Sequence, residues 1–179
     1  MQYQFKKHML AAMLVGSMLQ TSAFAGTKLD DATIFAIFDQ AHSAEIGTGR
    51  LGYKYGHAKE VRAHAKMVAT DHEAVQQMGR DLAKKLNMVP TPPDNDTSLA
   101  QQAETAEMLT AKSGVEFDQA YLHHGIITHE AVITSIKETL LPAIKNPEFK
   151  ALVNKVLPGL EHHLVEAKAV AKKLGMEHH

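Results

Sequence analysis

Four side chains that commonly bind metals fall on the apolar faces of predicted helices: Glu45, His72, His129 and His163. His129 shows the pattern well, because it interrupts a row of apolar and small residues spaced three and four positions apart. Such a row lies on one face of a helix, and that face normally packs into a core. Burying an imidazole or a carboxylate there is unfavourable unless a partner satisfies it. The four residues therefore predict a polar site inside a helical core.

The chemistry of this set points to one divalent transition metal ion. Three neutral imidazoles and one carboxylate suit zinc, copper or iron better than calcium or magnesium. Asp71 and Thr128 directly precede His72 and His129, and we expect them to accept hydrogen bonds from ring N–H groups that face away from the ion. A second interpretation needs no metal: the histidines are hydrogen-bonded only to one another and to Glu45.

Four long helices are needed to position these residues, and the apolar spacing predicts them. The predicted helices cover residues 30–56, 59–87, 113–141 and 146 onward, with a short helix over 98–112 before the third long one. Each candidate ligand lies roughly 18 to 28 Å from the turn of its helical hairpin, at 1.5 Å per residue. Two packed hairpins would bring all four residues to one level. The expected fold is all-α: a four-helix bundle with one short crossover helix.

Several glycines follow Glu45 in the first predicted helix, at positions 47, 49, 52 and 56. Each weakens a helix by about 1 kcal/mol relative to alanine. One interpretation is that a neighbouring helix approaches closely at these positions. The alternative is that the helix ends early, near Gly47.

The N-terminal residues 1–25 resemble a secretory signal. Lys6 and Lys7 precede an apolar run over residues 9–19, and Ala-Phe-Ala at 23–25 fits a cleavage site. The run is too short to span a bilayer comfortably. We expect residues 26–179 to form one exported, periplasmic bundle domain without an integral membrane span after cleavage.

The amino-acid composition excludes several kinds of site and partner. The chain has 179 residues, no cysteine, 12 histidines and a formal net charge of −1. The absence of cysteine excludes disulfides and thiolate metal sites, and without a basic stripe we expect no nucleic-acid partner. We expect His123, His124 and His162 to lie on the surface. Whether they or His42 assist the metal site stays open.

The same residues carry a family resemblance. The matching segments are 44–46 (Ala-Glu-Ile), 67–72 (Met-Val-Ala-Thr-Asp-His), 117–122 (Phe-Asp-Gln-Ala-Tyr-Leu), 129–130 (His-Glu) and 157–164 (Leu-Pro-Gly-Leu-Glu-His-His-Leu). The chain resembles the exported bacterial family known as domain of unknown function 4142. The resemblance implies a ferritin-like four-helix bundle and a location in the bacterial envelope, but little about activity.

Three functions fit these observations. The first is a periplasmic module that binds one metal ion for storage, buffering or delivery. The second is a metal-dependent oxidase or peroxide scavenger. A di-iron oxidase is disfavoured, because the Glu-x-x-His motif of such bundles does not occur on the predicted apolar faces, and His42-x-x-Glu45 reverses its order. The third is a structural or stress protein of the envelope without a metal. The sequence favours the first, and catalysis is not the expected role.

Overall fold

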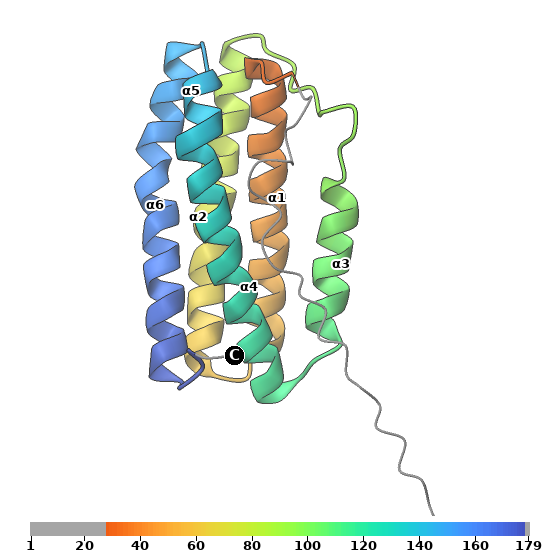
Figure 1. Ribbon diagram of the computed structural model, residues 1–179, viewed down its shortest axis with the longest axis vertical. Coiled ribbons are helices and arrows are strands. Elements are labelled where there is room, and N and C mark those ends of the chain that lie inside the picture. The colour runs from red at the N-terminus through yellow and green to blue at the C-terminus, as the bar shows by residue number, and fades with distance from the viewer. Residues whose placement is uncertain (1–27, 178–179) are drawn as a thin grey trace, which may run out of the picture.

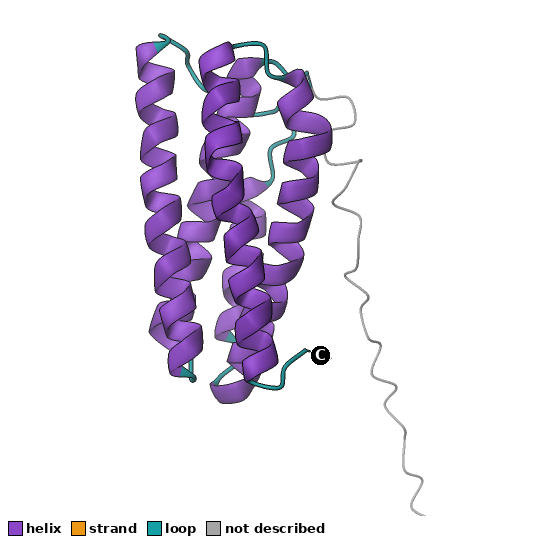
Figure 2. Cartoon of the chain, turned by 90° about the vertical axis from the view of Figure 1, so that its left-hand side faces the viewer, coloured by secondary structure: helices purple, strands orange, loops and turns teal. Residues whose placement is uncertain are grey.

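The computed structural model describes residues 28–177, and within that range the regular structure is entirely helical (Figures 1 and 2). The helices are α1 (Asp31–Tyr55), α2 (Lys59–Lys85), α3 (Ser98–Thr110), α4 (Gly114–Ser135), a π-helical segment (Ile136–Leu140), α5 (Leu141–Ala143) and α6 (Pro147–Lys173). The all-α prediction is confirmed. The first and second long helices match the predicted ranges to within two residues at each end.

Four long helices lie side by side, and the short helix α3 runs along their outside (Figure 1). α1 and α6 run in one direction, and α2 and α4 run in the other (Figure 1). α1 packs against α2, α4 packs against α6, and α2 also packs against α6. α3 packs on α1 and carries the chain back to the end of the bundle where α2 began. The predicted four-helix bundle with one short crossover helix is therefore present.

Local signals in the sequence set the starts of the first and last helices. The side chain of Asp30 accepts a hydrogen bond from the backbone N–H of Thr33, which caps α1. The side chain of Asn146 caps α6, and Pro147 occupies the first helical position, where its missing N–H costs nothing. The helix that holds His129 differs from the prediction, because it passes through a π-helical turn and stays helical to Ala143.

Two aspartates tie the turns of the bundle to helices distant in sequence. Both carboxylate oxygens of Asp118 in α4 accept hydrogen bonds from the backbone N–H groups of His57 and Ala58, at 2.8 and 2.7 Å. These groups belong to the turn that precedes α2, whose own N-cap residue supplies no side-chain acceptor. At the opposite end, Asp31 in α1 accepts from the backbone of residues 145 and 146, both at 2.8 Å.

The glycines of α1 allow close contact with neighbouring helices. A Cβ atom added to Gly49 would lie 3.0 Å from the carbonyl oxygen of Ala65 in α2. One added to Gly52 would lie 2.5 Å from the ring of Tyr121 in α4. The close-approach interpretation is thus correct at these two positions. The early end near Gly47 is wrong, since α1 continues to Tyr55.

Two apolar clusters fill the core on either side of a polar middle. One cluster includes Phe35 and Phe149, whose rings stack at 3.6 Å between centroids. The other includes Val61 and Phe117. On α2, α4 and α6 the candidate histidine lies in sequence between the residues of the two clusters. The histidines therefore form a layer that divides the apolar core.

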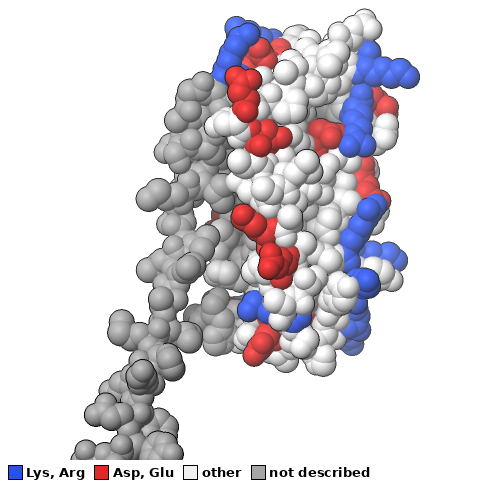
Figure 3. Space-filling model, turned by 90° about the vertical axis from the view of Figure 1, so that its right-hand side faces the viewer, with Lys and Arg blue, Asp and Glu red and all other residues white. Residues whose placement is uncertain are grey.

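The surface carries charges of both signs. Figure 3 shows acidic side chains scattered over one face and basic side chains gathered along its edge. Several exposed ion pairs connect different helices: Arg50–Glu73, Arg80–Asp39, Lys85–Glu148, Lys137–Glu161, Lys168–Glu130 and Lys173–Glu60. Exposed pairs of this kind contribute about 0–1 kcal/mol each, so the core and the helix caps dominate stability.

The expected secretory signal, residues 1–25, lies outside the described residues. Among the helices of residues 28–177, none has both the length and the apolar composition needed to cross a bilayer.

Candidate metal centre

Three of the four predicted ligands come together in the middle of the bundle. His72 from α2, His129 from α4 and His163 from α6 each offer one ring nitrogen, and these nitrogens lie within 4.8 Å of one another. The ring centroids are 5.2 to 5.9 Å apart. Each of these side chains is at most 4% exposed. The group is therefore a compact, buried set of three imidazoles from three different helices.

Hydrogen bonds fix the ring orientation of two of these histidines. The Nδ1 atom of His129 donates to the carbonyl oxygen of Gly125 at 2.8 Å, one turn earlier in α4. The Nε2 atom of His163 donates to the carboxylate of Asp71 in α2 at 3.0 Å. Because carbonyl and carboxylate oxygens only accept, the ring protons lie on these two nitrogens. The lone pairs therefore lie on Nε2 of His129 and Nδ1 of His163.

The third histidine is bonded to a residue of the first helix. The Nδ1 atom of His72 lies 2.7 Å from the Nδ1 atom of His42, which is itself buried. The ring of His42 also packs edge-on against Phe38, with centroids 4.4 Å apart. One ring nitrogen of each member of the group thus has a hydrogen-bonding partner.

The other ring nitrogen of each member has none. Fully buried side-chain nitrogens without a partner include Nε2 of His72, Nε2 of His129 and Nδ1 of His163. Buried polar atoms without partners are rare in folded proteins, and each needs an explanation. Each of these three atoms is the second nitrogen of a ring whose first nitrogen is hydrogen-bonded, and the three rings lie side by side, so the atoms are candidates to bind a single ion.

Burial also favours the neutral, metal-binding form of the rings. It lowers the pKa of His72 to about 2 and that of His42 to about 4. Burial lowers the pKa of His163 as well, although its hydrogen bond to Asp71 acts in the opposite direction. Neutral imidazoles are the forms that bind transition metals. Zinc, copper and iron fit this donor set.

Glu45, the fourth predicted ligand, is buried in α1 but is not a member of the three-histidine group. Its charge adds to burial in raising the pKa of Tyr121, and it opposes the effect of burial on His163. The carboxylate therefore acts electrostatically on the same part of the core. Its role as a fourth ligand stays a prediction.

Two buried histidines near the group were not identified as site residues. The sequence leaves open whether His42 assists the site, although this residue follows Phe38 by four positions and so shares its helix face. His64 was missed: its Nε2 atom lies 3.3 Å from the carbonyl oxygen of His163, and its Nδ1 atom is buried without a partner. Burial lowers the pKa of His64 to about 4. The signal for His64 was weak, since it directly precedes Ala65 on the edge of the apolar face.

Three further histidines, at positions 123, 124 and 162, are the ones that we expect on the surface. His123 and His162 are exposed, as expected. His124 was also expected on the surface but is half-buried, and its Nε2 atom is 3.5 Å from the hydroxyl of Thr128. The predicted role of Thr128 is therefore wrong, because Gly125 supplies the acceptor for His129. Asp71 does accept from a ligand histidine, but from His163 across the helix interface instead of its neighbour in sequence.

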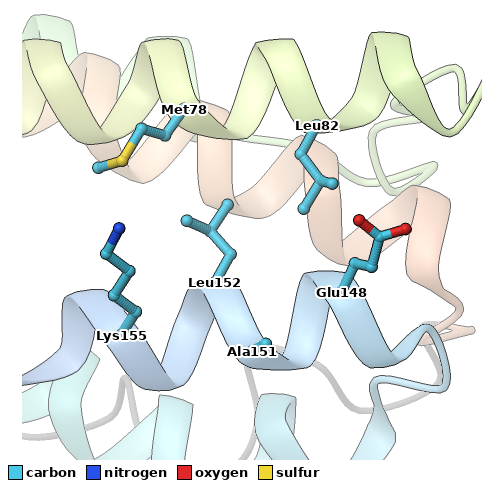
Figure 4. Close-up of a pocket in the computed structure, with 6 residues that line it drawn as sticks. All are labelled: Met78, Leu82, Glu148, Ala151, Leu152 and Lys155. Atoms are coloured by element: carbon cyan, nitrogen blue, oxygen red, sulfur yellow. The ribbon is translucent and has the colours of Figure 1, made fainter.

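A surface groove between α2 and α6 is a separate feature. It has a volume of about 340 Å³ and is lined by Met78, Leu82, Glu148, Ala151, Leu152 and Lys155 (Figure 4). Its lining includes no histidine, and its two charged groups have opposite signs. The groove has no converging set of ligands, so we place the candidate site at the buried histidines.

Comparison with known proteins gives a family but no named relative. Residues 17–170 match the sequence profile of the family described as "Domain of unknown function (DUF4142)". Comparison with curated proteins and with solved structures gave no match. The matched range contains His42 and all four predicted ligands. Since the match covers most of the sequence, the chain belongs to the DUF4142 family.

Proposed function

We propose that this protein binds one divalent transition metal ion in the core of its bundle, for metal storage, buffering or delivery. His72, His129 and His163 are the proposed ligands, with Glu45 as the fourth. The proposed location is the bacterial envelope, after export and removal of residues 1–25. The ion would link helices that are distant in sequence and so stabilise the bundle.

One observation carries this proposal: three histidines that each place one ring nitrogen within 4.8 Å of the others also each have one buried ring nitrogen without a hydrogen-bonding partner. In a purely structural histidine cluster, the rings would be expected to satisfy one another. Here each ring instead has one nitrogen hydrogen-bonded to a partner outside the group, and its other nitrogen is buried without a partner. This arrangement of ligands and outer hydrogen bonds is typical of protein metal sites.

The architecture supports the same proposal. Bundles hold metals with side chains that project inward from facing helices, and the ferritin-like class has one long crossover connection. The segment from the end of α2 to the start of α4, which contains α3, is such a connection. We therefore assign this bundle to the ferritin-like class as part of the proposal.

A metal-dependent oxidase or peroxide scavenger is the second candidate. Three protein ligands with a free fourth position are typical of catalytic sites, whereas structural zinc sites use four. Glu45 is not a member of the three-histidine group, and a fourth position that is free of a protein ligand would favour this candidate. Binding without turnover stays our first choice, because the ligands are deeply buried.

Metal analysis of protein purified from the periplasm of its own host tests the proposal. We expect about one equivalent of zinc, copper or iron per chain in the wild-type protein, and little in His129→Ala. Intact mass on the same sample should show a chain that begins at Gly26. Oxygen or peroxide consumption by the loaded protein would favour the enzyme. A metal-free wild-type protein that also binds none of these ions in vitro would favour the structural interpretation.

A further inference from the structure

The hydrogen bond between His42 and His72 joins two nitrogens of the same kind. At 2.7 Å between the two Nδ1 atoms, one atom must donate and the other must accept. If His72 donates, its lone pair lies on Nε2, which is one of the three buried nitrogens without a partner. If His42 donates, His72 carries its proton on Nε2 and has no lone pair to offer an ion. The direction of this one hydrogen bond therefore decides whether the third ligand is available.

Burial favours donation by His72. The Nε2 atom of His72 is fully buried without a partner, and an unpaired buried N–H is less common than an under-satisfied acceptor. The Nε2 atom of His42 is not among the fully buried unpartnered atoms in the described part of the chain. When His72 donates, the proton of His42 lies on its Nε2 atom. Donation by His42 would instead leave a buried N–H without a partner on Nε2 of His72.

The ring of His42 is held in place by packing. Phe38 lies one turn before it in α1 and contacts it edge-on. Phe38 in turn occupies the space above Gly79 in α2, where an added Cβ atom would lie 2.6 Å from its ring. Phe38 also packs edge-on against Phe149, with ring centroids 6.0 Å apart. His42 is therefore a fixed acceptor and not a side chain free to turn away.

We propose that His42 is a positioning residue of the metal centre: it keeps the proton of His72 on Nδ1 and thereby directs the Nε2 lone pair toward the ion. This inference rests on the proposed metal site. Through His42, helix α1 would contribute to the metal centre whether or not Glu45 binds the ion. It also completes a pattern in which a carboxylate, a backbone carbonyl and a neutral imidazole each orient one ligand.

Zinc affinity of purified full-length variants tests this role. His42→Leu removes the acceptor while keeping an apolar side chain, and we expect about 10- to 100-fold weaker zinc binding, the usual cost of losing an outer partner. His42→Asn places an amide oxygen near the position of Nδ1, and we expect it to restore most of the affinity. Exposed His123→Leu is the matched control and should bind like wild type. Circular dichroism of each metal-free variant confirms that it is folded.

The outcomes separate this inference from the metal site itself. Wild-type protein that binds neither zinc, copper nor iron overturns the metal proposal. Wild-type affinity in a folded His42→Leu protein overturns only the role of His42. A direct measurement does not depend on any variant: nitrogen-15 NMR of the zinc-loaded wild-type protein should show a protonated Nδ1 in His72. An unprotonated or metal-bound Nδ1 in His72 would overturn the inference even if His42→Leu failed to fold.

Discussion

Asp118 and His129 lie about three turns apart on the same helix, and both are buried polar side chains on an apolar face. Asp118 is fully buried, and both of its oxygens accept backbone N–H groups. His129 has one nitrogen paired and the other without a partner. The difference shows that burial of a polar residue does not by itself mark a binding site. A stronger indication of a binding site is a buried hydrogen-bonding atom without a partner, when neighbouring residues have such atoms as well.

The two residues should therefore respond in opposite ways to substitution. Asp118 is satisfied within the protein, so its contribution is to folding and needs no ligand. The histidines are satisfied only in part, so their contribution should appear when a metal is present. Each prediction below tests one side of this contrast.

The largest expected effect is that of Asp118→Ala, which leaves the backbone N–H groups of His57 and Ala58 without acceptors. Hydrogen bonds to a charged group contribute about 1.5–3 kcal/mol each, so losing two should cost about 3–6 kcal/mol of unfolding free energy. Urea denaturation of the metal-free protein measures it. Asp118→Asn keeps an acceptor oxygen and should cost less. A loss below 1 kcal/mol for Asp118→Ala would contradict its structural role.

Acid should act on the histidine layer of the metal-free protein. Burial lowers the pKa of His42 and of His64 to about 4 from an ordinary value of 6.5. The unfolded chain therefore binds more protons below pH 6.5, and stability falls as the pH drops. Each residue contributes about 1.4 kcal/mol per pH unit, so the two together should remove on the order of 4 kcal/mol between pH 6.5 and 5.

Denaturation curves at several pH values measure this slope. His64→Leu is the matched variant, because it removes one of the buried rings whose pKa is lowered and keeps an apolar side chain. Its slope between pH 6.5 and 5 should be smaller by about 1.4 kcal/mol per pH unit. A wild-type stability that stays constant over this range would mean that the buried rings are not held neutral.

Metal binding should have the next largest effect. With metal at about 100 times its dissociation constant, linkage adds roughly 2.7 kcal/mol to the free energy of unfolding. For a domain of this size, the melting temperature should rise by about 5 to 10 °C. Differential scanning calorimetry with zinc at pH 7.5 measures the shift. His129→Ala should abolish most of it, whereas His124→Ala should retain it. Equal losses in the two variants would mean that the site is misplaced.

Periodicity was enough to predict the helices and the convergence of three candidate ligands. The rows that contain His72, His129 and His163 have a regular spacing, and each helix is long enough for the middle residues to meet. The glycines of α1 also indicated close packing, although the sequence alone did not choose between that and an early helix end. Asp118 lies about three turns from His129, which is too far for the same ion, and it binds the turn before α2.

The outer partners could not be predicted, because they depend on how neighbouring helices are rotated about their axes. Asp71 precedes His72 in sequence but bonds to His163 on another helix. His42 and His64 lie beside the expected apolar rows, and close helix packing widens the buried face enough to include them. The π-helical turn after Ser135 likewise has no distinct spacing signal. Sequence periodicity predicts which face of a helix is buried. Which groups form hydrogen bonds across helices can be seen only in the assembled bundle.

The smallest expected effect is that of His129→Leu on the metal-free protein, and it sharpens the contrast with Asp118. Leucine fills a similar volume, and the substitution removes a buried nitrogen without a partner. The carbonyl oxygen of Gly125 loses the ring N–H but keeps the backbone N–H of residue 129, as in any α-helix. Losing one neutral hydrogen bond costs about 1 kcal/mol, and the gain from removing the unpaired nitrogen should offset it. We therefore expect urea denaturation without metal to show a change within about 1 kcal/mol of wild type, in either direction. A loss as large as that of Asp118→Ala would mean that His129 is a structural residue, and the metal-free interpretation of the histidine layer would then be preferred.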